Sequence, residues 1–262
     1  AFGYKALFTQ VADGARNTGI GLCALHGNTT GDDNVAVGYG AGDSNTTGSS
    51  NISVGSGALA TSTTATGNTA VGNLTLFDNT TGAQNTAIGN EALANNTTAA
   101  DNVAIGSGAA FKNTSGNNNT TVGTNSFKCN TTGNDNTAFG SQALLVATTA
   151  TANTGLGRAA MCKTTTGANN TVVGYYSMEG NTTGANNTAV GRTALACNTT
   201  ASNNTAVGCK ALAANTTAVE NTAVGRNAMV ANTTGANNTA VGADSLDLST
   251  TGAENVSIGS AA

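Results

Sequence analysis

The sequence predicts an all-β chain folded as a parallel β-solenoid, or β-roll, and three observations support that prediction. One glycine recurs with a 17-residue period, an asparagine stands at the fourth position before it, and an apolar residue stands directly before it. The unit reads approximately N-T-T-G-x-x-N-T-A-V-G-x-x-A-L-x-x. Helical-hairpin repeats have periods above about 30 residues, so a unit this short suits one turn of stacked β-structure.

The recurrent glycine sets the frame of the repeat. It occurs at Gly21, Gly38, Gly55, Gly72, Gly89, Gly106, Gly123, Gly140, Gly157, Gly174, Gly191, Gly208, Gly225, Gly242 and Gly259. Gly3 precedes Gly21 by one position more than the period, so the first unit has an extra residue. We expect about 15 stacked coils in one continuous array over residues 1–262, and we expect that array to be part of a longer fibre.

Within each unit, the segments N-T-A-V, x-A-L and N-T-T are expected to be short strands. Glycines of the Gly38 and Gly31 type are expected at corners, where a residue without Cβ can take a positive φ. The second apolar position is usually Leu, as in Leu59 and Leu93, and Gly42 and Ala110 are its weak members. The density of Gly, Asn and Thr disfavours helix throughout.

The coils must stack to be stable, because one Val and one Leu per unit cannot offset the conformational entropy lost when the whole unit is ordered. Stacking aligns equivalent side chains into ladders. The asparagine before the marker glycine is the main candidate for a structural ladder. Its members are Asn34, Asn51, Asn68, Asn85, Asn102, Asn119, Asn136, Asn153, Asn170, Asn187, Asn204, Asn221, Asn238 and Asn255.

Strand alternation predicts which side chains face the interior. If Val37 points inward, Val35 does too and Ala36 points outward; after the corner, Leu25 points inward and Ala24 outward. The outward alanines would form a flat apolar strip, typical of a subunit interface, with a parallel homotrimer favoured. The interface candidates are Ala70, Ala87, Ala104, Ala138, Ala189, Ala206, Ala223 and Ala240.

The motif N-T-A-V-G-x-x-A-L, as in residues 187–195 and 204–212, resembles two groups of proteins. One is the YadA-like head repeat of trimeric autotransporter adhesins, which implies a left-handed, trimeric β-roll. The other, which it resembles more closely, is the N-T-A-V-G repeat of phage tail fibres and of some bacterial and algal surface proteins. The adhesin unit is commonly shorter, so its roll does not transfer coil for coil.

The strongest chemical signal is the glycosylation acceptor tripeptide Asn-x-Thr/Ser, here called a sequon. Ten units place it at one equivalent position, which predicts a column of glycans along one edge; the alternative is that Asn and Thr serve only as turn and ladder residues. The candidates are Asn28, Asn45, Asn79, Asn96, Asn113, Asn130, Asn181, Asn198, Asn215 and Asn232. Ser62, Ala147, Thr164 or Ser249 replaces the asparagine in the other four units.

Catalytic, metal and cofactor sites are not expected. Charged residues make up 8% of the chain, with a formal net charge of −4 and no run of like charge, which argues against nucleic-acid binding. The five cysteines form no CxxC pair, and His26 is the only histidine. No apolar stretch is long enough for membrane insertion.

These features predict a structural or adhesive fibre on an extracellular, cell or virion surface, which self-associates as a homotrimer or end to end. Exposed tyrosines, Tyr39, Tyr175 and Tyr176, are candidates for contact with cell-surface glycans. The alternative is an ice-binding β-solenoid. A two-column Thr-x-Thr face is not evident, because the threonines of each T-T pair are adjacent and alternation turns only one of them outward. A β-helix lyase would need irregular coils that gather several charged groups.

Overall fold

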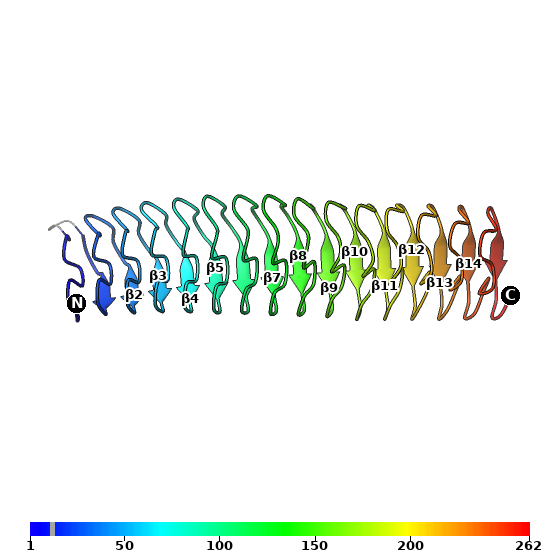
Figure 1. Cartoon of the computed structure of the whole chain (residues 1–262), viewed down its shortest axis with the longest axis horizontal. Helices are drawn as coiled ribbons and strands as arrows, with labels where there is room; N and C mark the ends of the chain where they lie inside the picture. The colour runs from blue at the N-terminus through cyan, green and yellow to red at the C-terminus, as the bar shows by residue number, and fades with distance from the viewer. Residues whose placement is uncertain (11–13) are drawn as a thin grey trace. The chain divides into compact units, whose positions relative to one another are not determined.

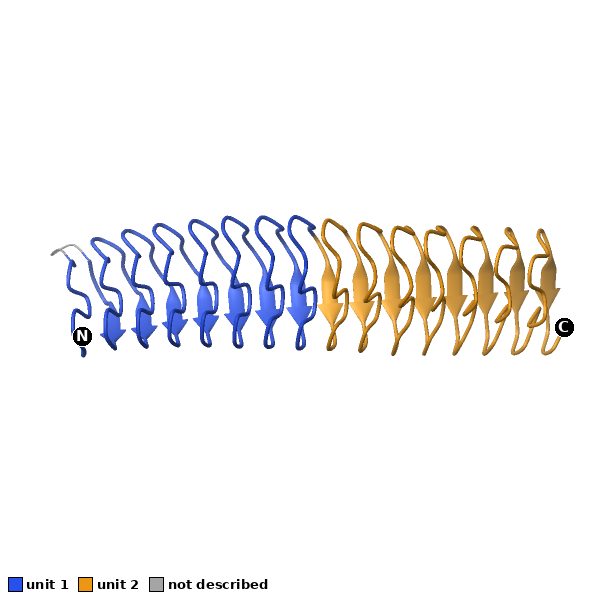
Figure 2. Cartoon of the chain, viewed as in Figure 1, with its two compact units in different colours: residues 1–134 blue, residues 135–262 orange. Residues whose placement is uncertain are grey.

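The structure is a computed structural model that describes residues 1–10 and 14–262. The described residues form short strands, turns and bends, and none of them is helical. The chain divides into two compact units, Ala1–Asn134 and Asp135–Ala262 (Figure 2). Each unit is a parallel β-solenoid with 17-residue coils, which confirms the predicted fold class.

Each coil contributes one strand of three residues, and successive strands within a unit pair in parallel (Figure 1). The first unit contains β1 (Thr18–Ile20), β2 (Val35–Val37), β3 (Ile52–Val54), β4 (Thr69–Val71), β5 (Thr86–Ile88), β6 (Val103–Ile105) and β7 (Thr120–Val122). The second contains β8 (Thr137–Phe139), β9 (Thr154–Leu156), β10 (Thr171–Val173), β11 (Thr188–Val190), β12 (Thr205–Val207), β13 (Thr222–Val224), β14 (Thr239–Val241) and β15 (Val256–Ile258). Paired residues of neighbouring strands are one 17-residue repeat apart in the sequence, so that Val190 lies beside Val207.

The prediction of three strands per coil was wrong, because the x-A-L and N-T-T segments are turns and bends. Leu59 and Leu93 have φ of 51° and 49°, whereas a parallel strand needs φ near about −120°. The main chain still bonds from coil to coil there: Leu25 N donates to Ala41 O at 2.9 Å, and Thr46 N donates to Thr63 O at 2.8 Å. Main-chain hydrogen bonds therefore link neighbouring coils in the turns and bends as well, although the backbone there is not a β-strand.

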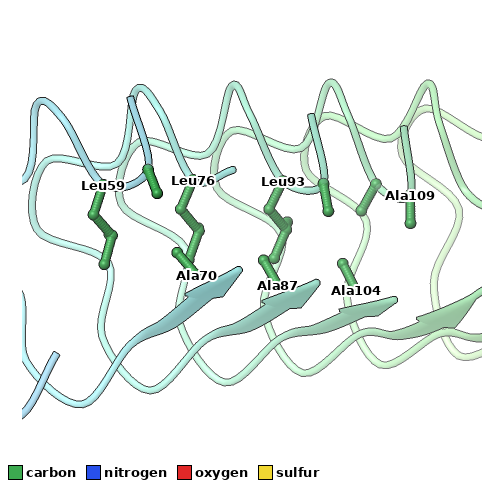
Figure 3. Close-up of a cluster of buried hydrophobic side chains, with 10 residues drawn as sticks. Leu59, Ala70, Leu76, Ala87, Leu93, Ala104 and Ala109 are labelled. Atoms are coloured by element: carbon green, nitrogen blue, oxygen red, sulfur yellow. The ribbon is translucent and has the colours of Figure 1, made fainter. Parts of the chain in front are cut away.

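The predicted inward and outward faces of the strand were also wrong. Ala36 is fully buried, whereas Val35 and Val37 are partly exposed. Figure 3 shows the packing: Leu59, Leu76 and Leu93 reach across the coil toward the strand alanines, and these side chains together form the interior. The alanine before each leucine, such as Ala92, is buried as well and does not face outward.

The marker glycine is required by both conformation and space. Gly208 has a φ of 138°, a region that side chains rarely adopt. A Cβ placed on it would lie 2.3 Å from the carbonyl oxygen of Gly225 in the next coil. Because the obstacle is main chain, no side-chain movement relieves it.

Gly42 occupies the place of the inward leucine and keeps the same left-handed conformation, with a φ of 59°. The missing side chain leaves a cavity of about 10 Å³, whose lining includes Leu25, Leu59, Ser53 and Ser62. Gly42, a weak member of the second apolar position of the repeat, is therefore a local packing defect.

Candidate functional site

The asparagines before the marker glycines form a buried ladder within each unit, as their spacing suggested. Asn51 Nδ2 donates to Asn34 Oδ1 at 3.1 Å, and the main-chain N of Asn51 donates to the same oxygen at 3.0 Å. The Nδ2 of Asn34 also donates to Gly48 O at 2.8 Å. Each amide therefore binds main chain and side chain of neighbouring coils, and we call this column the first ladder.

A second buried ladder, which the sequence analysis missed, consists of the asparagines assigned as glycosylation candidates. Asn45 Nδ2 donates to Asn28 Oδ1 at 2.8 Å and to Gly48 O at 2.9 Å. In the other unit, Asn198 Nδ2 donates to Asn181 Oδ1 at 2.9 Å. The regular replacement of this asparagine only by small residues was the signal that it faces inward.

Burial corrects the predicted glycan column. The ten candidates are between 0% and 3% exposed, and their Nδ2 atoms are committed to the second ladder, so no sugar can be attached there in the folded chain. These residues are Asn28, Asn45, Asn79, Asn96, Asn113, Asn130, Asn181, Asn198, Asn215 and Asn232.

Substitutions interrupt the second ladder and leave acceptors without donors. In this column Ser62 follows Asn45, and Ser249 follows Asn232. Among the described residues, Asn45 Oδ1, Asn232 Oδ1 and the buried Ser62 Oγ have no hydrogen-bond partner. At Thr164 the column continues more weakly, because its hydroxyl accepts from Asn181 Nδ2 at 3.3 Å. These interruptions are the polar defects of the interior.

The proposed alanine interface is not at the surface either. Ala70, Ala87, Ala104, Ala138, Ala189, Ala206, Ala223 and Ala240 are at most 1% exposed. They are the inward residues of their strands, and the equivalent residues Thr121 and Val172 are fully buried as well. They cannot contact a second subunit in the folded chain.

Within each unit the outward strand positions instead form two columns, which we call the strand-face columns. The first and third residues of every strand are Thr, Val, Ile, Leu or Phe, and none is charged. The first residues of β8 to β14 are all threonine. Ile105, Phe139 and Val241 are 38%, 56% and 38% exposed, so the column of third residues is apolar as well as accessible.

The face after the marker glycine carries the most varied side chains and is hollowed in the first unit. Gly40 and Gly57 stand where other coils have larger side chains, and they border an open groove of about 380 Å³. Tyr39 and Phe77 provide aromatic walls, and Asp43 is among the polar groups beside them. This combination suits a sugar ring, which presents apolar C–H faces and hydroxyl edges.

The two other candidate tyrosines form a surface cluster in the second unit. Tyr175 and Tyr176 meet edge to face with ring centroids 4.5 Å apart. Arg158 Nη1 lies 3.1 Å from both phenol oxygens, and the guanidinium lies over both rings. The cluster is held together by its own contacts.

Titratable groups are dispersed over the surface. His26 stacks on Phe8 with centroids 5.8 Å apart, and its Nδ1 lies 3.6 Å from Asp43 Oδ1. The hydrogen bond from Arg16 holds the pKa of Asp33 below its ordinary value. No cluster of three His, Cys, Asp or Glu side chains suited to a metal occurs among residues 1–10 and 14–262.

The same described part of the chain contains no helix with the length and apolar character needed to cross a bilayer. No protein-family model matches the chain, and no curated protein matches its sequence.

Proposed function

We propose that this chain is a structural and adhesive fibre protein that self-associates through the strand-face columns. The observation that supports this is their uniformity: both outward positions of every strand are uncharged and mostly β-branched. A repeated, uncharged face with one accessible apolar column is typical of a subunit interface. The proposed assembly through this face is a parallel homotrimer. Joining of chains end to end into a filament, the other proposed mode of self-association, would use the ends of the stack and not the strand-face columns.

A role without catalysis and a location outside the cell or on a virion are parts of the same proposal. The first is supported by the scarcity of groups suited to acid–base chemistry, since charged residues make up 8% of the chain and His26 is its only histidine. The second rests on the resemblance of the repeat to tail-fibre and surface-protein repeats. Adhesion would use the groove between Tyr39 and Phe77 to bind surface glycans.

The experiment that tests self-association introduces charge into the strand-face columns. Substituting Val190→Lys, Val207→Lys and Val224→Lys places three ammonium groups on partly exposed positions of β11 to β13. We expect sedimentation velocity to show the unmodified chain as an assembly and this variant as a monomer, with unchanged circular dichroism.

The matched control adds the same charges to the same coils at another face, by Thr183→Lys, Thr200→Lys and Thr217→Lys. These threonines are exposed at the N-T-T corner. The control should assemble like the unmodified chain. Monomeric behaviour of the unmodified chain, or equal loss of assembly in both variants, would refute the proposed interface.

Ice binding is the second candidate, and the threonine column of β8 to β14 favours it. Seven consecutive strands present Thr outward beside an apolar residue, at a strand spacing of about 4.8 Å. A regularly spaced row of threonine hydroxyls and methyl groups could order water into a lattice. Thermal hysteresis that is lost on Thr188→Lys would support this function, and its absence in the unmodified chain would exclude it.

A further inference from the structure

Two structural properties distinguish the sequons of this chain. One is whether the asparagine side chain is exposed, since a glycosyltransferase must reach its Nδ2. The other is whether the hydroxyl at the third position of the sequon is already hydrogen-bonded, since the acceptor motif depends on that hydroxyl. Neither property can be obtained from the tripeptide itself.

Five sequons combine an exposed asparagine with a hydroxyl for which the structure shows no hydrogen bond. Each begins directly before a first-ladder asparagine and ends on the outward threonine that opens a strand. The acceptors are Asn118, Asn169, Asn186, Asn203 and Asn237, and the matching threonines are Thr120, Thr171, Thr188, Thr205 and Thr239.

The main chain presents these asparagines without local unfolding. Asn186 and Asn203 have φ of 58° and 62°, in the left-handed region that asparagine tolerates well. Each main-chain N bonds to the preceding coil, as Asn186 N does to Ala168 O at 3.1 Å. No hydrogen bond of the five side-chain amides occurs among the described residues, so the corner is fixed while each amide is turned to solvent.

Other sequons fail one of the two conditions. Asn73 is exposed, but the hydroxyl of Thr75 is buried and donates to Gly89 O at 2.8 Å. Asn95 is half-buried, and Thr97 Oγ1 donates to Thr114 O at 3.0 Å. The ten asparagines of the second ladder fail because they are buried.

We propose that Asn118, Asn169, Asn186, Asn203 and Asn237 are N-glycosylation sites of the folded chain. The donor would be an activated sugar of the nucleoside-diphosphate class. In the transfer, the bond between sugar C1 and the diphosphate oxygen breaks, C1 bonds to Nδ2, one amide proton is lost, and the nucleoside diphosphate leaves. Sugars would then line one corner of the coils, beside the strand-face columns.

The spacing of the sites limits what they can hold. Asn169, Asn186 and Asn203 belong to three consecutive coils, and therefore lie about 4.8 Å apart. Asn237 is flanked by coils that carry Glu220 and Glu254 at the same position. We therefore expect no more than single sugars on the three consecutive sites, and larger glycans only on the isolated Asn118 and Asn237.

The test uses a soluble asparagine glycosyltransferase with UDP-glucose, acting on the folded full chain. Peptide mapping by mass spectrometry should find hexose on the five acceptors and none on the ten second-ladder asparagines. The digested, unfolded chain is the reaction control, and its peptides should be modified at both sets. The lysine variant of Val190, Val207 and Val224 is treated in parallel, because association of the strand faces would cover the threonines.

Two single variants complete the test on matched sequons. Thr205→Ala should abolish hexose at Asn203 alone. Thr200→Ala, which removes the exposed threonine of the buried Asn198 sequon, should change nothing in the folded chain. Modification of the second ladder in the folded chain, or five unmodified acceptors in a lysine variant whose peptides do react, would overturn the proposal.

Discussion

The side-chain amide of Asn45 donates a hydrogen bond to Asn28 Oδ1 across 2.8 Å, although each residue opens a sequon. The same atom, Nδ2, is the one that a glycan would need. One residue type at one position in the repeat thus has two incompatible uses, and the fold selects the structural one. The free energy of unfolding depends on keeping these buried amides hydrogen-bonded.

Ser62→Asn should repair the second ladder. An asparagine there can donate to Asn45 Oδ1, which has no partner, and would also replace the unpaired Ser62 Oγ. We expect the free energy of unfolding to rise by about 1 kcal/mol, measured by thermal or denaturant unfolding. Thr64→Asn, at an exposed position nearby in the same corner, is the control and should have little effect. An unchanged stability in Ser62→Asn would contradict the assigned defect.

Asn198→Ala should have the opposite effect. The substitution removes the donor to Asn181 Oδ1 and the acceptor of Asn215 Nδ2, so it leaves unpaired groups in neighbouring coils. A loss of about 1 to 3 kcal/mol is expected in denaturant unfolding. Thr200→Ala, at the exposed end of the same sequon, should cost much less. Equal losses would mean that the ladder contributes nothing specific.

Gly55→Ala should be poorly tolerated, because its Cβ would lie 2.3 Å from Gly72 O at a φ of 134°. The coils would have to separate locally, which breaks hydrogen bonds on both sides, and we expect a markedly lower melting temperature or failure to fold. Gly67→Ala is the matched control. It also has a positive φ, 70°, but the nearest atom to its Cβ would be Gln84 Cγ at 3.6 Å, an ordinary contact. The idea fails if both variants melt alike.

Cys162 should be a slow thiol. Burial, and then the charge of Glu179, raise its pKa, so less of the reactive thiolate is present near neutral pH. Alkylation by iodoacetamide should therefore be slower than at the exposed Cys197, and its rate should continue to rise at more alkaline pH. Glu179→Gln should shift the pH profile of Cys162 alkylation to lower pH. An unchanged profile in this variant would disprove the contribution of Glu179.

The period, the marker glycine and the first ladder could be predicted from the sequence because each follows from exact recurrence at the length of one unit. The inward face of the strand could not. Strand alternation permits either Ala36 or the pair Val35 and Val37 to face inward. Hydrophobicity favours Val37 over Ala36 as the inward residue. The choice depends on the width of the coil, because Leu59 and its equivalents already fill the space opposite the strand.

The same limit explains the glycosylation candidates. A sequon describes three adjacent residues, whereas accessibility depends on contacts one full coil away, such as that between Asn28 and Asn45. The exposed acceptors at Asn186 and Asn203 overlap the first ladder in sequence and differ from it by a single position. Moving by one residue, from Asn187 to Asn186, changes the side-chain amide from buried to exposed.

The two amide ladders share a direction, because the later coil donates to the earlier one, as Asn51 does to Asn34 and Asn198 to Asn181. A stack built this way is polar: one end presents amide donors and the other presents acceptors. In a twofold, isologous contact, two donor ends or two acceptor ends would meet, and their amides could not hydrogen-bond to each other. Any longitudinal growth that extends the ladders must therefore be head to tail, with every added copy pointing the same way.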